Sequence, residues 1–192
     1  MIFRRRESLD TPAARVSALR DLGQAPELLG VHPWLNTADG EPLTLAGLFG
    51  HVVLIEFWTF ACGNCQRTLP FVRRMHRRYR PELVVLGVHT PELSFERRVR
   101  NVERAVRERA IAFAVGLDND YRAWDAYQNR YWPTQYLIDA TGRIRYAHIG
   151  EGGYRTTEAA ILALIGEARQ TNVADEAPEI RAPEPPRRSE RS

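Results

Sequence analysis

The stretch VVLIEFWTFACGNC, residues 52–65, decides how this chain is expected to fold. Its first seven residues are apolar except for Glu56, which is typical of a strand buried on both faces. Three residues separate this strand from Cys62, and apolar residues then recur at helical spacing. The sequence therefore predicts a strand over 52–58, a short loop, and a helix over about 63–79 that begins beside Cys62.

Cys62 and Cys65 are the only two cysteines of the chain, and their position makes them a candidate redox-active pair. A helix N-terminus offers unpaired backbone N–H groups and the positive end of the macrodipole, which favour a thiolate at Cys62. An exposed thiolate can attack a substrate disulfide, and the second thiol can then resolve the mixed disulfide. The alternatives are an inert or structural pair and half of a zinc site, but no His-x-x-x-His spacing supplies further zinc ligands.

Size and composition suit one globular domain with additions at its ends. The chain has 192 residues, 44% of them hydrophobic, and a net charge of +3. No run approaches the roughly 18 apolar residues that span a bilayer. The start, residues 1–6, is basic, but no apolar stretch follows it as in a signal peptide. We therefore expect a cytoplasmic protein, or an extracytoplasmic one if Met1 is not the native start.

Outward from residues 52–65, the pattern predicts strands alternating with helices, which indicates an α/β fold with a largely parallel sheet. Further strands are expected at 83–89, 112–117, 134–139 and 143–149, the last two as an antiparallel hairpin at one edge. Helices are expected from Pro91 onward, with a stripe of Phe95, Val99, Val102 and Val106, and over 120–130 and 155–169.

The N-terminal part and the tail are expected to lie outside this pattern. Trp34-Leu35 and residues 43–45 flank a turn cluster, which predicts a β-hairpin. A short helix is expected over 12–22. The predicted organisation is an N-terminal extension over 1–25, a domain over 26–170, and a disordered tail over 171–192, rich in Pro, Glu and Arg.

Three motifs in this order resemble the thioredoxin superfamily, specifically its extended thioredoxin-like branch of redoxins and thiol-disulfide interchange proteins. They are Glu56-Phe57-Trp58, Cys62-Gly63-Asn64-Cys65, and Trp132-Pro133-Thr134 before the last predicted hairpin. Residues 87–92 are similar to the same segment in the thioredoxin-like domains of cytochrome-biogenesis-type membrane proteins. The resemblance implies a thioredoxin-like fold, a central mixed sheet flanked by helices, with the N-terminal β-hairpin as an extension.

The resemblance also implies a thiol-disulfide oxidoreductase that acts on protein disulfides or dithiols. It would exchange electrons with an upstream donor or acceptor and need no cofactor or metal. Cys62 is then the nucleophile and Cys65 the resolving thiol. Glu56 stands where thioredoxins carry a buried acid. Burial should raise the pKa of its carboxyl, so that it can accept the Cys65 proton, unless it reaches solvent or pairs with an arginine.

The remaining predicted site residues face a substrate. Pro133 is expected as a cis-proline opposite the disulfide, with Trp132 pairing its backbone with a bound peptide and Thr134 following. The alternative is a trans proline that opens an edge strand. Trp58 is expected beneath the active-site loop, and Phe60 beside Cys62 or in the core. Asn64 is neutral where oxidising relatives often carry His, which favours a reductant.

Two other functions stay open at this point. Thr59-Phe60-Ala61-Cys62 matches half of the Pro-x-x-x-Thr-x-x-Cys loop of thiol peroxidases, although Ile55 stands at the proline position. A peptide-binding module without turnover is the other. The arginines of 73–80 and the i, i+4 pairs Glu96–Arg100 and Glu103–Arg107 indicate solvated helix faces rather than a nucleic-acid surface.

Overall fold

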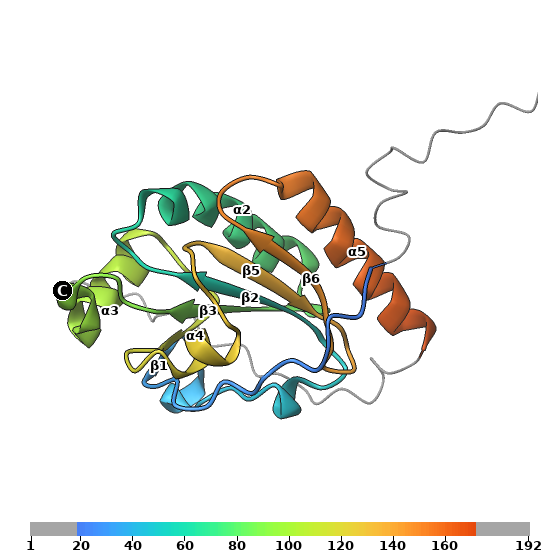
Figure 1. The fold of residues 1–192 in the computed structure, drawn as a ribbon, viewed down its shortest axis with the longest axis horizontal. Coiled ribbons are helices and arrows are strands. Elements are labelled where there is room, and N and C mark those ends of the chain that lie inside the picture. The colour runs from blue at the N-terminus through green and yellow to red at the C-terminus, as the bar shows by residue number, and fades with distance from the viewer. Residues whose placement is uncertain (1–18, 172–192) are drawn as a thin grey trace, which may run out of the picture.

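A six-stranded mixed sheet organises the part of the chain that this computed structural model describes, residues 19–171 (Figure 1). The order of the strands across the sheet is β1-β4-β3-β2-β5-β6. Their bounds are β1 Trp34–Leu35, β2 Val52–Trp58, β3 Leu83–His89, β4 Ala114–Leu117, β5 Thr134–Ile138 and β6 Ile144–Ile149. β2, β3 and β4 are parallel, whereas β5 is antiparallel to both β2 and β6. The predicted parallel centre and antiparallel edge hairpin are confirmed.

Helices cover both faces of the sheet (Figure 1). The α-helices are α2 Gly63–Tyr79, α3 Val99–Glu108, α4 Arg122–Ala126 and α5 Tyr154–Gln170. Short 3-10 turns are η1 Ala38–Gly40, η2 Ala46–Leu48 and η3 Ser94–Arg97. One core layer joins α2, α3 and α5 to the sheet, and the other joins α4 and the N-terminal segment to its opposite face.

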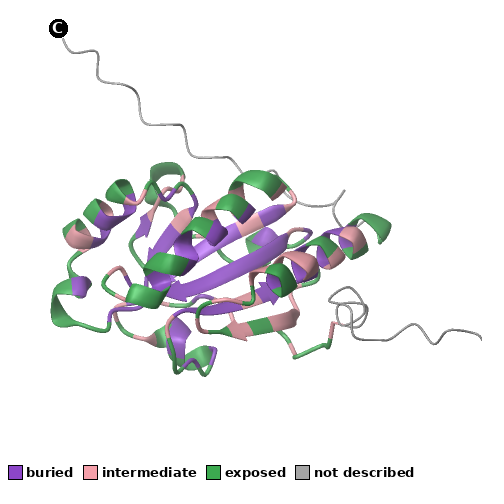
Figure 2. Ribbon diagram, turned by 90° about the horizontal axis from the view of Figure 1, so that it is seen from above, coloured by how far each residue is buried: buried purple, intermediate pink, exposed green. Residues whose placement is uncertain are grey.

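β2 is the centre of both core layers. All seven of its residues are buried, and the buried sheet lies beneath helices whose outer sides are exposed (Figure 2). Because successive side chains of a strand point to opposite faces, Leu54 and Trp58 join the α2 layer and Ile55 and Phe57 join the α4 layer. Glu56 therefore points toward the α2 side, where the cysteines are.

The predicted N-terminal hairpin is wrong. β1 pairs antiparallel with β4, and residues 43–45 form no strand. The backbone N–H groups of Leu45 and Ala46 donate instead to the carboxylate of Glu27 at 2.8 and 3.2 Å. Gly116 permits the pairing that does form, because a Cβ at this position would collide with Val31 and Trp34. The choice of partner thus depends on tertiary packing.

The helix expected from Pro91 onward is interrupted. It consists of η3 and α3, separated by Arg98 in an extended conformation (φ −79°, ψ 117°). Phe95, predicted to face the core, is 46% exposed. The helix expected over 120–130 is only α4, five residues long, and Gln128 beyond it is left-handed with φ 52°.

The predictions for the two chain ends fall only partly within the described residues. Residues 19–22 are not helical, and the rest of the helix predicted over 12–22 lies outside the described residues. So does the tail from residue 172 on. The segment 19–25 lies along the β5–β6 hairpin, where the N–H groups of Leu22 and Ala25 donate to hairpin carbonyls at 2.8 and 3.0 Å.

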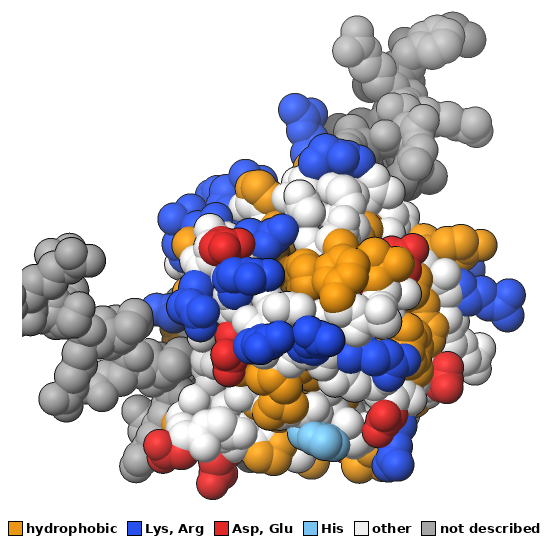
Figure 3. All heavy atoms as spheres, turned by 90° about the vertical axis from the view of Figure 1, so that its left-hand side faces the viewer, with side chains coloured by type: hydrophobic (Ala, Val, Ile, Leu, Met, Phe, Trp, Pro, Cys, Tyr) orange, Lys and Arg blue, Asp and Glu red, His pale blue; other side chains and the backbone are white. Residues whose placement is uncertain are grey.

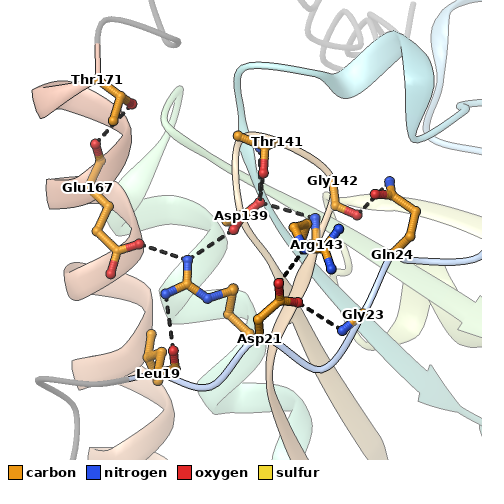
Figure 4. Close-up of polar contacts among 11 residues, drawn as sticks. Leu19, Asp21, Gly23, Gln24, Asp139, Thr141, Gly142, Arg143, Glu167 and Thr171 are labelled. Carbon is orange, nitrogen blue, oxygen red and sulfur yellow. Dashed lines mark hydrogen bonds and ion pairs between the residues drawn. The ribbon is translucent and has the colours of Figure 1, made fainter.

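An arginine network fastens this segment to the body of the domain (Figure 4). Arg145 of β6 donates to Asp139 at 3.0 Å, to Glu167 of α5 at 2.9 Å, and to the carbonyl of Leu19 at 3.1 Å. We call these four residues the Arg145 network.

Candidate active site

The redox pair lies at the start of α2, just past the carboxyl end of β2. Cys62 is the N-cap of this helix, and its sulfur accepts a hydrogen bond from the N–H of Cys65 at 3.3 Å. Cys62 is partly exposed, whereas Cys65 is only 2% exposed, and both are free thiols. Burial above all raises the pKa of Cys65, with the hydrogen bond to Cys62 and the nearby Glu56 acting in the same direction. The two sulfurs thus differ as an attacking and a resolving thiol must.

Glu56 lies in the middle of β2 and is 2% exposed. Among residues 19–171, its Oε2 has no hydrogen-bond partner. Removal from water raises the pKa of this carboxyl to about 8, against a smaller opposing effect of Gln135 on the neighbouring strand. Glu56 is therefore shielded from solvent, and within the described part of the chain it pairs with no arginine. It is a carboxyl that can gain or lose a proton near neutral pH.

Trp132 and Pro133 lie opposite Cys62. The peptide bond between them is cis, and the sulfur of Cys62 lies 4.0 Å from the carbonyl oxygen of Trp132. The Trp132 indole donates to the carbonyl of Thr90 at 3.1 Å, and its ring packs on Trp124 with 4.2 Å between centroids. The backbone before the proline is thereby held beside the reactive sulfur.

Three of the five residues predicted to contact a substrate, Trp58, Pro133 and Thr134, are buried. Trp58 is 2% exposed and Thr134 is 1% exposed, so their side chains support the site from within. Trp58 packs edge-on against His89, and the Thr134 hydroxyl donates to the carbonyl of Tyr131 at 2.8 Å. Phe60 and Trp132 are the predicted contact residues that remain partly exposed.

Glu96 is the main feature of the site that the sequence did not reveal. Its i, i+4 spacing to Arg100 indicated a solvated face, but the structure buries it completely. One carboxylate oxygen accepts from the Thr59 hydroxyl and from the N–H of Ala61 at 2.9 Å. The other accepts the N–H groups of Glu92 and Leu93 at 2.9 and 2.8 Å. Burial would raise the pKa of Glu96, but these hydrogen bonds outweigh it and lower the pKa.

His89 completes this polar layer, although the sequence suggested no role for it. Its ring is fully buried, and Nε2 lies 3.3 Å from the Thr59 hydroxyl. Burial lowers the pKa of the imidazole to about 4, which keeps the ring neutral at physiological pH. The ring stacks on Phe60 with centroids 5.5 Å apart. His89 is thus a packing surface for the loop before Cys62.

Apolar side chains are exposed in the loops at this end of the sheet. Leu93 and Phe95 follow β3, Tyr131 precedes β5 and Ile149 ends β6, and each is 46–61% exposed. From this end, Figure 3 shows hydrophobic side chains in the middle of the face with arginines around them. Such a surface suits contact with another polypeptide.

Among residues 19–171, no three side chains of His, Cys, Asp or Glu are grouped so that they could hold a metal ion. In the same part of the chain, no helix has the length and apolar character needed to cross a membrane.

Known proteins share this sequence pattern and fold. The sequence pattern of the AhpC/TSA family matches residues 24–147. Protein DipZ of Mycobacterium tuberculosis is 42% identical over 168 residues, which cover 87% of this chain but only 23% of DipZ. The thiol-disulfide oxidoreductase YkuV of Bacillus subtilis is 31% identical over 143 residues, 74% of this chain and 94% of YkuV. The crystal structure of the thioredoxin-like superfamily protein SPOA0173 superposes with a TM-score of 0.69 at 31% identity, covering 74% of this chain and 96% of that one.

Proposed function

The chain belongs to the AhpC/TSA family, in the redoxin branch of the thioredoxin superfamily, and we propose that it is a thiol-disulfide oxidoreductase that reduces protein disulfides. One observation carries the proposal. The partly exposed sulfur of Cys62 lies at a helix N-terminus, 4.0 Å from the backbone carbonyl of Trp132, with the buried thiol of Cys65 behind it. This arrangement supplies an attacking sulfur, a place for the substrate backbone and a resolving sulfur.

The first step would be attack by Cys62. Its thiolate forms a bond to one sulfur of the substrate disulfide, the substrate S–S bond breaks, and the second substrate sulfur leaves as a thiolate. The Trp132–Pro133 backbone would align the substrate chain as an added strand. The exposed apolar residues around it, among them Phe95 and Tyr131, support a polypeptide as the substrate.

The second step would release the substrate. Cys65 must lose its proton before it can attack the sulfur of Cys62, and burial opposes this loss. In this proposal Glu56 accepts that proton; its pKa of about 8, near neutrality, and the effect of its charge on Cys65 support the assignment. The Cys62–Cys65 disulfide then forms, and the second substrate sulfur leaves and is protonated. An upstream dithiol must return two electrons to the pair.

Asn64 is the basis for proposing that the cysteine pair acts as a reductant. This side chain is neutral, and its amide oxygen accepts from Arg67, which forms an ion pair with Glu151 at 2.8 Å. The added cation is therefore balanced by an anion, and the surroundings of the pair supply little extra stabilisation of a thiolate, which favours a reductant. The proposed compartment is the cytoplasm, with an extracytoplasmic location as the alternative.

The thiol-peroxidase alternative gains no specific support. Its motif depends on Thr59, but the hydroxyl of this residue is buried and donates to Glu96. The proton of this hydroxyl is thus already donated to a buried carboxylate. A slow reaction of Cys62 with hydrogen peroxide, close to that of a free thiol, is expected.

Substrate trapping tests the proposal. Cys65→Ser should retain the attacking sulfur and accumulate mixed disulfides with a model substrate such as insulin, visible on non-reducing gels. Cys62→Ser with Cys65→Ser is the matched control and should trap nothing. The unaltered protein should accelerate insulin reduction by dithiothreitol. Failure of both the trapping and the acceleration would contradict the proposed function.

A further inference from the structure

The peptide group between Phe60 and Ala61, one residue before Cys62, is held at both of its polar ends by charged side chains. Its N–H, on Ala61, donates to the carboxylate of Glu96 at 2.9 Å. Its C=O, on Phe60, accepts from the guanidinium of Arg109 at 3.1 Å and from the amide of Gln66 at 2.9 Å. An anion and a cation thus hold one peptide group from opposite directions.

We propose that Glu96 and Arg109 are positioning residues that clamp the Phe60–Ala61 peptide group and thereby orient Cys62 for attack on a substrate disulfide. The inference rests on the proposed function, since it assigns these residues to that reaction. Neither residue contacts the reacting sulfur. They act through the backbone that carries it.

The charges match the group they hold. A peptide N–H carries positive partial charge and its C=O negative partial charge, so a carboxylate on one and a guanidinium on the other stabilise a single orientation. Rotation of the peptide group by half a turn would place its carbonyl against Glu96 and its N–H against Arg109. Hydrogen bonds to charged partners are about twice as strong as neutral ones, and this alternative orientation would lose both.

Capping of a helix end does not account for Glu96. Its Oε2 serves the N–H groups of Glu92 and Leu93, at the start of η3. Its Oε1 serves Thr59 and Ala61, which lie 37 and 35 residues away in sequence and belong to the loop that follows β2. The carboxylate therefore joins the loop before Cys62 to the loop after β3.

The loop after β3, which Glu96 joins to the loop before Cys62, also contacts Trp132 opposite the cysteine. In the loop after β3, the carbonyl of Thr90 accepts the indole N–H of Trp132 at 3.1 Å. The clamp at Glu96 and the anchor at Thr90 thus lie on one short segment, residues 90–96. This segment places both the backbone before Cys62 and the residue whose carbonyl lies 4.0 Å from its sulfur.

Arg109 likewise connects a distant part of the chain to the loop before Cys62. It follows the last residue of α3 and lies 49 residues from the carbonyl that it binds. Ordering an arginine side chain costs conformational entropy, and the hydrogen bond to the Phe60 carbonyl offsets that cost. Because a misplacement of about 1 Å can cost roughly a hundredfold in rate, the orientation of this peptide group has a direct kinetic consequence.

The test compares Glu96→Gln, Arg109→Gln and Arg109→Lys with the unaltered protein in steady-state insulin reduction at 25 °C. We expect Glu96→Gln to lower kcat about tenfold to a hundredfold and Arg109→Gln about fivefold to tenfold, with KM nearly unchanged. Arg109→Lys keeps the cation and should restore most of the rate. The double variant should lose less than the product of the single losses, because both residues act on one peptide group.

Arg104→Gln is the matched control. Arg104 lies on α3 and its side chain is 61% exposed. Within residues 19–171 its one ion pair is with Glu108, at 3.9 Å, so its removal should leave kcat unchanged. Melting temperatures of the variants are measured alongside kcat. If the two residues only stabilise the fold, Glu96→Gln and Arg109→Gln should melt at a lower temperature while kcat of the folded protein stays the same. That outcome would overturn the inference, as would parental rates in both variants. If Glu96→Gln does not fold, the two Arg109 variants decide.

Trapping and the insulin assay together separate this inference from the proposed function. If the unaltered protein does not accelerate insulin reduction and Cys65→Ser traps no mixed disulfide, the proposed function fails. If the unaltered protein reduces insulin and the clamp variants match its rate, only the clamp is wrong.

Discussion

Two buried glutamates lie on either side of the redox pair, and they have opposite protonation behaviour. Glu56, in β2 beneath the cysteines, is 2% exposed and its pKa is raised to about 8. Glu96, in η3 beside the loop before Cys62, is fully buried and its pKa is lowered. Burial is similar, so burial alone does not decide the charge.

The difference lies in the hydrogen-bond donors that each position offers. Glu56 is in a strand whose neighbours on both sides, β3 and β5, already use the backbone N–H groups. Glu96 is in η3, and the N–H groups of Ala61, Glu92 and Leu93, which lie outside the strands, point toward its carboxylate. An acid whose charge only one side chain stabilises is suited to proton transfer, and an acid with four donors is suited to holding backbone in place.

The largest expected effect is on turnover, and it concerns Glu56. Glu56→Gln should lower kcat for insulin reduction by about a hundredfold or more, because general-base catalysis contributes roughly 10²–10⁴. In the unaltered protein, the step that Glu56 assists should speed up as pH rises toward about 8 and then level off, since the carboxyl must be ionised to accept a proton. Single-turnover kinetics from pH 6 to 9 would show this rise, and its persistence in Glu56→Gln would contradict the assignment.

The second effect is on stability and again concerns Glu56. Its folded-state pKa of about 8 lies above the ordinary value of 4.5, so the unfolded chain releases this proton first as pH rises. Stability should therefore fall between pH 4.5 and 8, by an amount of about 4 kcal/mol from this group. Urea unfolding at pH 5 and pH 8 measures the change. Glu56→Gln should remove most of it, and an equal change in both proteins would contradict the prediction.

Glu96 should show the opposite sign. Because its pKa is lowered, its contribution is present above about pH 4.5 and is lost as pH falls below that value. Glu96→Gln places an NH₂ group against N–H donors and should cost about 2–3 kcal/mol at pH 7. The same unfolding series extended down to pH 3 should bring variant and parent closer together. At pH 8, Glu56→Gln should thus be more stable to unfolding than the parent, and Glu96→Gln should be less stable.

The smallest effect is expected far from the cysteines, in the Arg145 network. Arg145 is 19% exposed and holds Asp139 and Glu167 at the other end of the domain. Arg145→Met should lower stability by about 1–2 kcal/mol and leave kcat unchanged. Urea unfolding and insulin reduction measured on the same preparation would check both parts. A fall in kcat comparable to that of Glu96→Gln would contradict the prediction, because it would show that the Arg145 network affects catalysis.

Local sequence was sufficient for the elements with a strong hydrophobic pattern. β2, β3, α2 and α5 all form where they were predicted, because continuous apolar runs and helical stripes report burial directly. The same reasoning failed for the pairing of β1, for the broken helix after Pro91 and for Glu96. The partners of β1 and Glu96 lie far along the chain, and spacing within one segment carries no information about them.

By itself, the sequence determined that a Cys-x-x-Cys pair begins a helix after a buried strand, and that an acid lies within this strand. Hydrophobic periodicity and the needs of a helix N-terminus are local, so they can be read along the chain. Only the tertiary structure decided which acid would be charged. In the sheet order β4-β3-β2-β5, the Gln135 side chain only partly offsets the effect of burial on the pKa of Glu56, whereas Glu96 and Arg109, from 35 and 49 residues away, reach the peptide group before Cys62.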